Sequence, residues 1–352
     1  MDSSTLREQL RAQAARMNDG EGEAHTVLQW LSQAGYLQQG VPRALGGSGT
    51  RLWEAVQAIA EVSEECLTSG FLFWCQRVFV EYLLHTPNKA LRDQLLPDML
   101  SAQRAGATGL SNAMKYLGGL EPLRTRATLE THGVVLDGFL PWASNLQAGR
   151  FVVAVAAQVD DQRALVAAVP AEAEGVQRSD DLSLLGLRSS QTATLTLKGV
   201  RLSQGWLLAE DAHTFLASVR PCFLLLQCGL PMGLARRALQ VAGEQMQGVR
   251  SVLQERAERL CHEWQTLYEQ TRQFAVQERV ASEAMPALFQ TRIRWVRLAV
   301  QAVELELEAA GGAGFLHGTD TARRWREVAF LPVLTPSATQ LALQLQQAGW
   351  TE

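Results

Sequence analysis

Trp142 and Ser144 are the two residues of this chain whose types and spacing best suit the binding of a ligand. An indole presents a large, rigid face on which a flat ring system can stack, and a hydroxyl can donate a hydrogen bond to a ring nitrogen or accept one from it. A core tryptophan followed by a serine at a strand end has the same residue types. The pair is therefore a candidate site for a planar cofactor whose support must come from the surrounding sequence.

The other reactive side chains form no pattern typical of a known catalytic or metal site. The six histidines are scattered and form neither H-x-x-x-H nor H-E-x-x-H, so we expect no metal site. The sequence contains no G-x-S-x-G motif for a nucleophilic serine and no G-x-G-x-x-G or G-x-x-x-x-G-K-[ST] loop for phosphates. The five cysteines are odd in number and include no C-x-x-C pair, so we interpret them as small buried residues of a reduced compartment.

Composition and charge limit the class of protein. The chain has 352 residues, of which 47% are hydrophobic and 19% charged, enough for a large core and two or three structural units. The formal net charge of −4 offers no electrostatic footprint for a polyanion, so we expect no nucleic-acid partner. Because the polar start and the interrupted apolar run at 223–235 predict neither a signal peptide nor a membrane span, we expect a cytoplasmic protein.

The spacing of apolar residues changes twice along the sequence. Apolar residues recur at helical spacing up to about residue 106, and short β-rich runs follow up to about residue 208. In the last of these runs, at 192–197, threonines alternate with alanine and leucine, which is the period of a half-buried strand. Long helical patterns then cover 216–246, 252–280 and 284–310. We predict an α+β fold with a helical domain at 1–106, a β domain at 107–208 and a helical bundle at 209–352.

Four segments in order resemble the acyl-CoA dehydrogenase family. GYLQQGVPRALGGSG is similar to the family's V-P-x-x-x-G-G-x-G loop, and DGFLPWASNLQAGRFVVAVA to its G-x-K-x-W-I-T-N-A strand. LLGLRSSQTATLTLKGVRL is similar to the G-x-R-x-S-x-T element, and EAAGGAGFLHGTDTARRWREVAF to Q-x-x-G-G-x-G-Y with its R-x-x-R-D helix. The resemblance covers about residues 27–346 and implies a helical domain, a middle β-barrel or sandwich domain and a C-terminal four-helix-type bundle.

The resemblance implies an FAD site. Trp142 and Ser144 match the family's tryptophan against the isoalloxazine and threonine on flavin N5, and Thr108 and Ser111 lie where the family's T-E-P-x-x-G-S wraps the flavin. An ordinary loop of small residues would explain Thr108 and Ser111 equally well.

A second group of residues matches further family positions that contact FAD, in the case of Arg250 across a subunit boundary. Arg250 matches an arginine that reaches the FAD pyrophosphate of a neighbouring subunit, a role that suits a bidentate guanidinium. Gly311 and Gly312 match the double glycine that lets backbone approach the adenosine, although a helix C-cap would also explain them. Glu308 stands where the family has glutamine. The resemblance thus implies a homodimer or homotetramer.

The family's catalytic glutamate has no counterpart here. In FLPVLTPSATQL, which corresponds to the segment containing Y-E-G-T-x-Q, Thr335 or Pro336 occupies the position of the base, and a hydroxyl is too weak to replace it. The helix of RPCFLLLQCGLPMG, where some relatives carry the base, has no acid either. Glu304, Glu244 or Glu121 would have to supply it, so the catalytic residues stay unassigned.

Three functions are considered, and we favour the first because most members of the family are dehydrogenases that act on the CH-CH group of an acyl thioester. The first is a flavin-dependent dehydrogenase acting on an acyl-CoA or related small-molecule substrate, with an electron-transfer partner. The second is a flavin-dependent monooxygenase of the same fold, which needs no α-proton base and takes reduced flavin from a reductase partner. The third is a non-catalytic binding or assembly module that retains the fold.

Overall fold

The N-terminal part is helical and surrounds one central helix. A computed structural model of the protein describes residues 1–277 and 279–350. The helices of this part are α1 (Ser3–Asp19), α2 (Ala24–Gln33), α3 (Leu52–Glu65), α4 (Leu67–His85) and α5 (Lys89–Leu100). Every residue of α4 from Leu67 to Leu83 is buried, as expected of a helix covered on all sides. This helix therefore joins the other N-terminal helices to the sheet and to the C-terminal bundle, since it packs on all three.

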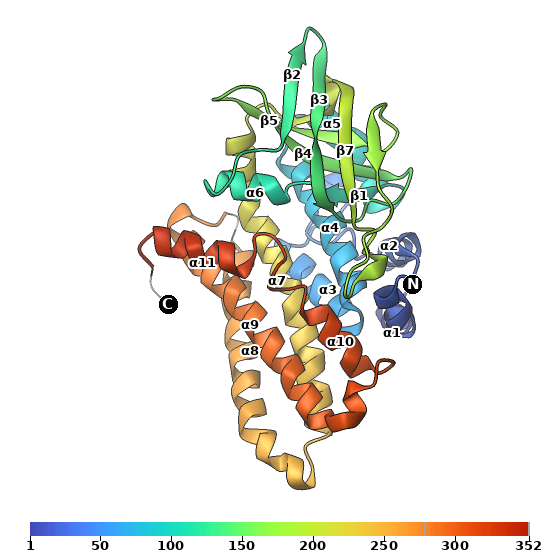
Figure 1. Ribbon diagram of the computed structural model, residues 1–352, viewed down its shortest axis with the longest axis vertical. Coiled ribbons are helices and arrows are strands. Elements are labelled where there is room, and N and C mark those ends of the chain that lie inside the picture. Colours follow the sequence, from blue (N-terminus) through green and yellow to red (C-terminus); the bar gives the residue numbers. More distant parts are fainter. Residues whose placement is uncertain (278, 351–352) are drawn as a thin grey trace.

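Between Ala105 and Ala209 the chain forms a mixed eight-stranded sheet, at the top of Figure 1. Its strands are β1 (Ala105–Thr108), β2 (Thr125–Glu130), β3 (Gly133–Ala143), β4 (Phe151–Gln158), β5 (Ala164–Pro170), β6 (Val176–Arg178), β7 (Ala193–Ser203) and β8 (Leu207–Ala209). The order is β6-β7-β3-β2-β4-β5-β8, and β1 pairs with β4 in parallel. The short helix α6 (Ser111–Leu117) follows β1. β4 and β5 are buried almost throughout, because helices cover the sheet on the side of α4 and α7.

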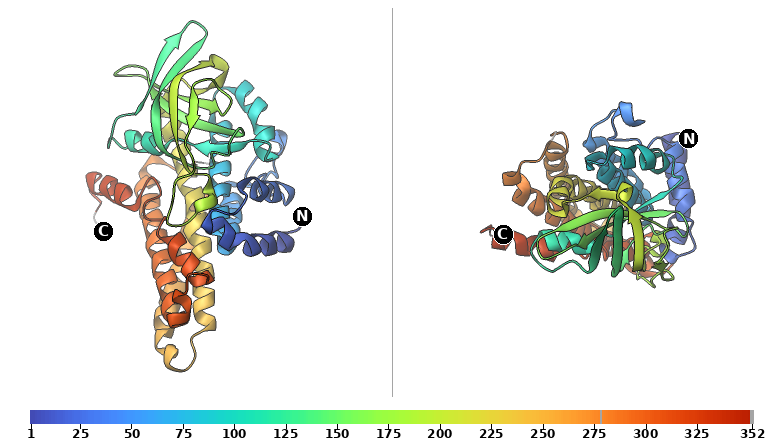
Figure 2. Two further views of the ribbon diagram at one scale, coloured as in Figure 1. Left: turned by 45° about the vertical axis from the view of Figure 1, so that its right-hand side comes forward. Right: turned by 90° about the horizontal axis from the view of Figure 1, so that it is seen from above.

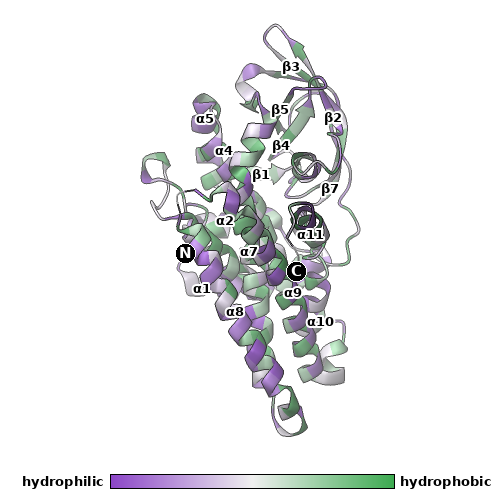
Figure 3. Cartoon of the chain, turned by 90° about the vertical axis from the view of Figure 1, so that its left-hand side faces the viewer, coloured by the Kyte–Doolittle hydropathy of each residue, from purple (hydrophilic) through white to green (hydrophobic). Residues whose placement is uncertain are grey.

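Three long helices form the second half of the helical core. They are α7 (Ala212–Glu244), α8 (Gln254–Ala275) and α9 (Met285–Ala310), and the shorter α10 (Asp320–Val328) and α11 (Ala338–Gln347) complete the chain. α7 packs between α3 and α9, which places it at the centre of the bundle in Figures 1 and 2. By length and composition α7 could cross a membrane, but 72% of its most apolar window is buried inside the protein. Its apolar character is thus explained by its place in the core, and Figure 3 shows the contrast with the hydrophilic residues of α8.

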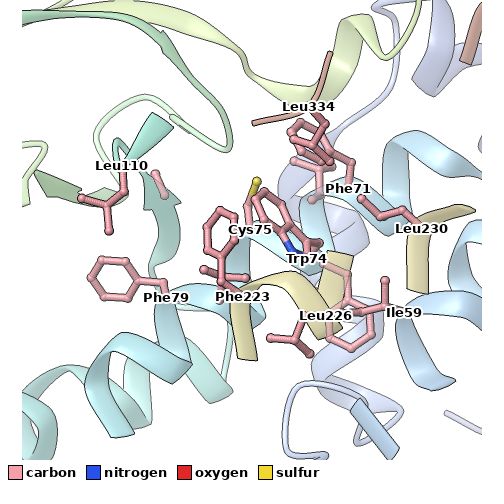
Figure 4. Packing of buried hydrophobic residues seen from close by; sticks show 14 of the residues in the cluster. Ile59, Phe71, Trp74, Cys75, Phe79, Leu110, Phe223, Leu226, Leu230 and Leu334 are labelled. Atoms are coloured by element: carbon pink, nitrogen blue, oxygen red, sulfur yellow. The ribbon is translucent and has the colours of Figure 1, made fainter. Parts of the chain in front are cut away.

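Aromatic side chains join the N-terminal and C-terminal helices. The indole of Trp74 stacks on Phe71, with 5.6 Å between ring centroids, and meets the edge of Phe223 at 5.0 Å. Phe71 in turn meets Phe330 at 4.7 Å. Figure 4 shows Phe71, Trp74 and Phe223 together at the centre of this cluster. The helical core is therefore built from two stretches of sequence that the sheet separates.

The α+β architecture predicted from the sequence is confirmed, with helices on either side of the strands in sequence. The division into domains at residues 106 and 208 stays a proposal, although the strands end close to it. The interpretation of all five cysteines as buried was wrong for Cys261, which is exposed, and for Cys222, which is half-buried. Cys261 lies on α8, whose amphipathic sequence turns only a narrow apolar face to the bundle.

Candidate functional site

A cavity of about 600 Å³ lies where the sheet meets α4, α7 and the segment that joins α10 to α11. Its apolar wall consists of aromatic and aliphatic side chains from α4, α7 and the 329–334 segment, with Phe71, Trp74, Phe223, Phe330 and Leu334 among them. Its polar wall consists mainly of hydroxyls. Because the walls come from all three regions of the sequence, only the folded chain can form this cavity.

Trp142 and Ser144 both line the cavity from the end of β3. The Trp142 side chain is 57% exposed, so its indole face is free to meet a ligand. The Ser144 hydroxyl lies 2.8 Å from the Thr192 hydroxyl, which lies 2.7 Å from that of Ser190. The loop that precedes β7 therefore fixes the Ser144 hydroxyl in a chain of three hydroxyls.

Thr108 and Ser111 line the same cavity, from the end of β1 and the start of α6. The Thr108 hydroxyl lies 2.9 Å from the phenol of Tyr82, and burial raises the pKa of Tyr82, so this phenol is protonated. An isolated bridge pairs Thr108 with Ser144. The structure thus brings together four of the seven predicted cofactor-binding residues.

Thr335 lies at the position predicted for the missing base. The Ser111 hydroxyl donates to the Thr335 hydroxyl at 3.1 Å, and the amide of Gln227 donates to the Thr335 carbonyl at 2.8 Å. Behind it, the buried Arg292 donates from Nε to the Gln227 side chain at 3.1 Å. None of the described residues that line the cavity is an aspartate or a glutamate, and its charged lining residues are Lys115 and Arg326. This wall can donate and accept hydrogen bonds, but it offers no carboxylate to remove a proton.

Of the three acids considered as relocated bases, Glu121 is the one near the cavity. Its carboxylate lies 3.2 Å from Nζ of the lining residue Lys115. Burial by itself would raise the pKa of Glu121, but hydrogen bonds from Asn112 and Lys115 outweigh it and lower that pKa. Glu304 is paired with Arg256 on the bundle, and Glu244 lies in the last turn of α7. A carboxylate with a lowered pKa is a weaker base, so Glu121 is poorly suited to the task.

Arg250, Gly311 and Gly312 form a separate group at the end of the bundle farthest from the sheet (Figure 1). A Cβ atom placed on Gly311 would lie 3.6 Å from Nη2 of Arg250. Gly311 ends α9 with a φ of 64°, which is glycine geometry, and the space next to Gly312 is open. Gly311 therefore serves as a C-cap whatever else it does.

Glu308, which replaces an expected glutamine, is paired with an arginine in the structure. One guanidinium nitrogen of Arg256 lies 2.6 Å from its carboxylate, and the other lies 2.6 Å from Glu304. The negative charge next to Gly311 and Gly312 is thus partly offset by an arginine one helix away, which is shared between two carboxylates.

Sequence reasoning missed Ser190 and Thr192, although both lie within the segment LLGLRSSQTATL. The signal was present, because a run of serine and threonine before a half-buried strand places hydroxyls at the strand's entrance. What the sequence does not show is that β7 pairs with β3, and this pairing brings the run next to Ser144.

Comparison with known proteins supports the fold and the family. The model of the acyl-CoA dehydrogenase N-terminal domain matches residues 3–103. The solved structure of butyryl-CoA dehydrogenase from Megasphaera elsdenii superposes with a TM-score of 0.86 at 14% identity, over 98% of this chain and 95% of that one. Residues 3–103 thus match the acyl-CoA dehydrogenase N-terminal domain, and the whole chain has the acyl-CoA dehydrogenase-like fold.

Sequence relatives of this chain include two kinds of enzyme. Benzylmalonyl-CoA dehydrogenase of Aromatoleum aromaticum is 21% identical over 248 residues, which are 68% of this chain and 66% of the relative. Dibenzothiophene monooxygenase of Mycolicibacterium goodii is 26% identical over 242 residues, 63% of this chain and 56% of the relative. The chain thus spans less than two thirds of the length of these curated relatives.

The superfamily fold is also seen in a solved monooxygenase. FMN-bound TdsC from Paenibacillus sp. A11-2 superposes with a TM-score of 0.79 at 18% identity, over 98% of this chain and 94% of that one. At this identity the likeness establishes the fold, and dehydrogenases and monooxygenases share it equally.

Proposed function

We propose that this protein is a flavin-dependent monooxygenase that uses reduced flavin from a reductase partner to oxygenate a small apolar molecule. The observation that carries this proposal is the cavity wall at Thr335, where hydroxyls stand in place of a carboxylate base. Oxygenation needs no α-proton abstraction, whereas dehydrogenation of an acyl thioester does. The names of the relatives and neighbours, dibenzothiophene monooxygenase and FMN-bound TdsC, support the same choice.

The residues present fit a flavin. The exposed face of Trp142 suits stacking with an isoalloxazine, and the hydroxyls of Ser144 and Thr108 can bond ring nitrogens and oxygens. The charged lining residues are cations, which suits a cofactor that carries phosphate. FAD is the form implied by the family resemblance, and we propose it as the cofactor.

The chain's own residues would bind, orient and shield the reactants. When bound, a reduced flavin supplies two electrons to O₂, so that one oxygen atom enters the substrate and the other leaves as water. The apolar wall of Phe71, Phe223 and Phe330 would hold an apolar substrate and exclude bulk water. The Ser144 hydroxyl can hold its proton toward the ligand, because Thr192 can accept or donate in the chain to Ser190.

We also propose that the active form is a homo-oligomer. Arg250, Gly311 and Gly312 are not part of the cavity wall, and we propose that they serve the cofactor of a second copy. Exposed apolar residues surround them: Val249, Val252, Phe315 and Leu316 are between 64% and 91% exposed. Patches of this kind mark interaction sites. Arg256 offsets part of the negative charge of Glu308 that would repel a dinucleotide.

A dehydrogenase is the second candidate, and Glu121 is the observation that favours it. Its carboxylate lies beside Lys115 at the cavity, and the relative benzylmalonyl-CoA dehydrogenase carries that activity in its name. For this activity the substrate would be an acyl-CoA, and electrons would leave to an electron-transfer partner.

The deciding experiment follows the flavin absorption of the purified protein after reconstitution with FAD or FMN. We expect oxygen consumption with chemically reduced flavin and no bleaching of the oxidised flavin by a panel of acyl-CoA thioesters. If a thioester bleaches the flavin and Glu121→Gln abolishes this bleaching, the protein is a dehydrogenase and the monooxygenase proposal is wrong. If the protein binds neither FAD nor FMN, the non-catalytic module is the function that remains.

Two tryptophan variants test whether the flavin binds at the proposed cavity. Trp142→Ala should weaken flavin affinity about 10-fold, because stacking on an exposed indole is lost. Trp325→Ala is the matched control, since Trp325 is 41% exposed on α10 and is not part of the cavity wall. Equal affinities in both variants would exclude the Trp142 site.

A further inference from the structure

Glu81, His85 and Cys222 bring three metal-binding side chains together outside the cavity described above. Glu81 and His85 are four residues apart on α4, so they share one face near its C-terminal end. Cys222 comes from the facing helix α7. One ligand atom from each residue lies within 4.8 Å of the other two. A search for paired histidines cannot find this cluster, because it has one histidine and its cysteine is distant in sequence.

We propose that these three residues form a binding site for a divalent transition metal, best suited to Zn²⁺. A carboxylate, an imidazole and a thiolate are the ligands that zinc takes in proteins, and three protein ligands leave a fourth position for water. The distance between Oε2 of Glu81 and Nδ1 of His85 is 3.5 Å. Two ligands at zinc bond lengths of about 2.0–2.1 Å in tetrahedral geometry are separated by roughly 3.3 Å. The observed pair therefore needs little movement to share an ion.

Arg77 fixes the carboxylate in the orientation that this site requires. Its guanidinium donates to Oε1 of Glu81 at 2.6 Å, and the carbonyls of Gln39 and Gly40 hold the guanidinium in place. Oε2 is left to face His85. Ligating carboxylates commonly have such a hydrogen-bonded partner on the other oxygen. The adjacent positive charge should reduce the affinity of the site, so we expect a reversible site in place of a permanent structural one.

Metal binding would change the protonation state of Cys222. Burial and the nearby carboxylate of Glu81 raise the pKa of Cys222, so the metal-free thiol is protonated. On binding, the thiol proton is released to solvent and an S–Zn bond forms, while His85 binds as the neutral imidazole. Nδ1 of His85 lies 2.9 Å from the Glu81 carbonyl oxygen. If Nδ1 is the ligand, it gives up this contact to bind the metal. If Nε2 is the ligand, the contact can stay.

A second cavity, of about 770 Å³, reaches His85, the exposed member of the cluster. His85 is part of its wall, together with Asn88, Thr214 and Ser218. The charged residues of this wall are Glu210 and Asp211, and the described lining includes no lysine or arginine. A wall of this composition attracts cations. The site therefore has ligands, an orienting partner and an entry path, which are the features that a metal site must show.

The test uses the full-length protein stripped with a chelator and then titrated with Zn²⁺ or Co²⁺. We expect about one Zn²⁺ per chain by elemental analysis after gel filtration, release of a proton on binding, and a thiolate-to-Co²⁺ charge-transfer band. His85→Ala should retain the fold because His85 is exposed, and it should lose the ion. Cys222→Ser should lose the charge-transfer band.

Cys261→Ser is the control, because Cys261 is an exposed thiol on α8 away from the cluster. Binding of Zn²⁺ and the Co²⁺ band should both be unchanged in it. The proposal is overturned if the unsubstituted protein binds no Zn²⁺ at micromolar concentrations, or if His85→Ala and Cys222→Ser bind it as the parent does. A Co²⁺ band that disappears in Cys261→Ser would equally overturn it.

Discussion

Glu65 joins three helices through one carboxylate. Its oxygens accept from Arg7 at 3.0 Å, from Arg11 at 2.8 Å and from Arg237 at 2.9 Å, so α1 and α7 are both tied to the end of α3. The Glu65 side chain is only 1% exposed. Three guanidinium groups around a buried carboxylate lower the cost of burying it and make its ionisation part of the fold.

This carboxylate should make stability depend on pH. Burial alone would raise the pKa of Glu65, but the bond from Arg11, the charge of Arg237 and the bond from Arg7 lower it below its ordinary 4.5. A depressed pKa contributes stability above about pH 4.5, and this contribution is lost as pH falls through the folded-state pKa. Glu65→Gln should therefore melt lower at neutral pH and lose less on acidification. Thermal melts between about pH 7 and pH 3 measure this, and parallel curves for the two proteins would refute it.

A second buried pair allows a test of paired charge. Arg324 binds both oxygens of Glu306, at 2.7 and 2.6 Å, and the Glu306 carboxylate is fully buried. Arg324→Met should lower the free energy of unfolding by about 3–5 kcal/mol, because it leaves a buried charge without its partner. Arg259→Ala, which breaks a pair on the exposed face of α8, should cost about 0–1 kcal/mol. Urea denaturation of both variants measures the free energy of unfolding, and similar losses of this free energy in the two variants would contradict the prediction.

At the scale of elements, two glycines set the distance between α3 and α7. A Cβ atom on Gly229 would lie 2.7 Å from the carbonyl oxygen of Val56, and one on Gly233 would lie 2.0 Å from that of Ala60. The backbones of these helices are therefore in direct contact. This contact helps to place Phe223, which precedes Gly229 on α7, against Trp74 in the cavity wall.

Gly233→Ala should destabilise the protein, although alanine usually favours a helix. The added methyl group must push α3 and α7 apart, and overpacking of this kind costs about 1–3 kcal/mol. Gly243→Ala on the same helix has open space around it and should stabilise by up to about 1 kcal/mol. Denaturant midpoints of the two variants should move in opposite directions. If both rise, α3 and α7 are not in close contact.

The elements were largely predictable, and the reasons are local. The alternation at 192–197 predicted β7, which runs over Ala193–Ser203 with alternating burial, because a strand's period is set by its own backbone. The predicted helix at 252–280 is shorter in the structure, Gln254–Ala275, with a 3₁₀ turn before it. Trp142 and Ser144 were predicted from the resemblance of one short segment, and both line the cavity, while their role in flavin binding stays a prediction. The pairing of Glu121 with Lys115 is local, but the place of Lys115 in the cavity wall depends on packing between distant segments and could not be predicted from the local sequence.

At the scale of the molecule, the proposed flavin-binding residues form two separate groups, one at the cavity and one at the end of the bundle. Flavin binding should therefore depend on assembly of the oligomer. Phe315→Asp puts a charge in the exposed apolar patch at the bundle end, so it should yield monomers and weaken flavin binding together. Leu129→Asp is the control, since Leu129 is 50% exposed on β2 in the sheet. Light scattering and flavin titration measure both effects. Monomers in the unsubstituted protein would refute the oligomer, whereas unchanged flavin affinity in a monomeric variant would refute only the shared site.

The split of the helical core by the sheet has a consequence for synthesis of the chain. Trp74 and Phe71 of α4 find their partners on α7 and beyond α10, on the far side of all eight strands in sequence. At roughly 5–20 residues per second, a ribosome needs on the order of 10–30 seconds to proceed from the end of α4 to the end of α7. During that interval the face of α4 that packs on α7 has no partner, although the other N-terminal helices can already cover the rest of it. We therefore expect the nascent N-terminal helices to be the part of this protein that depends on chaperones.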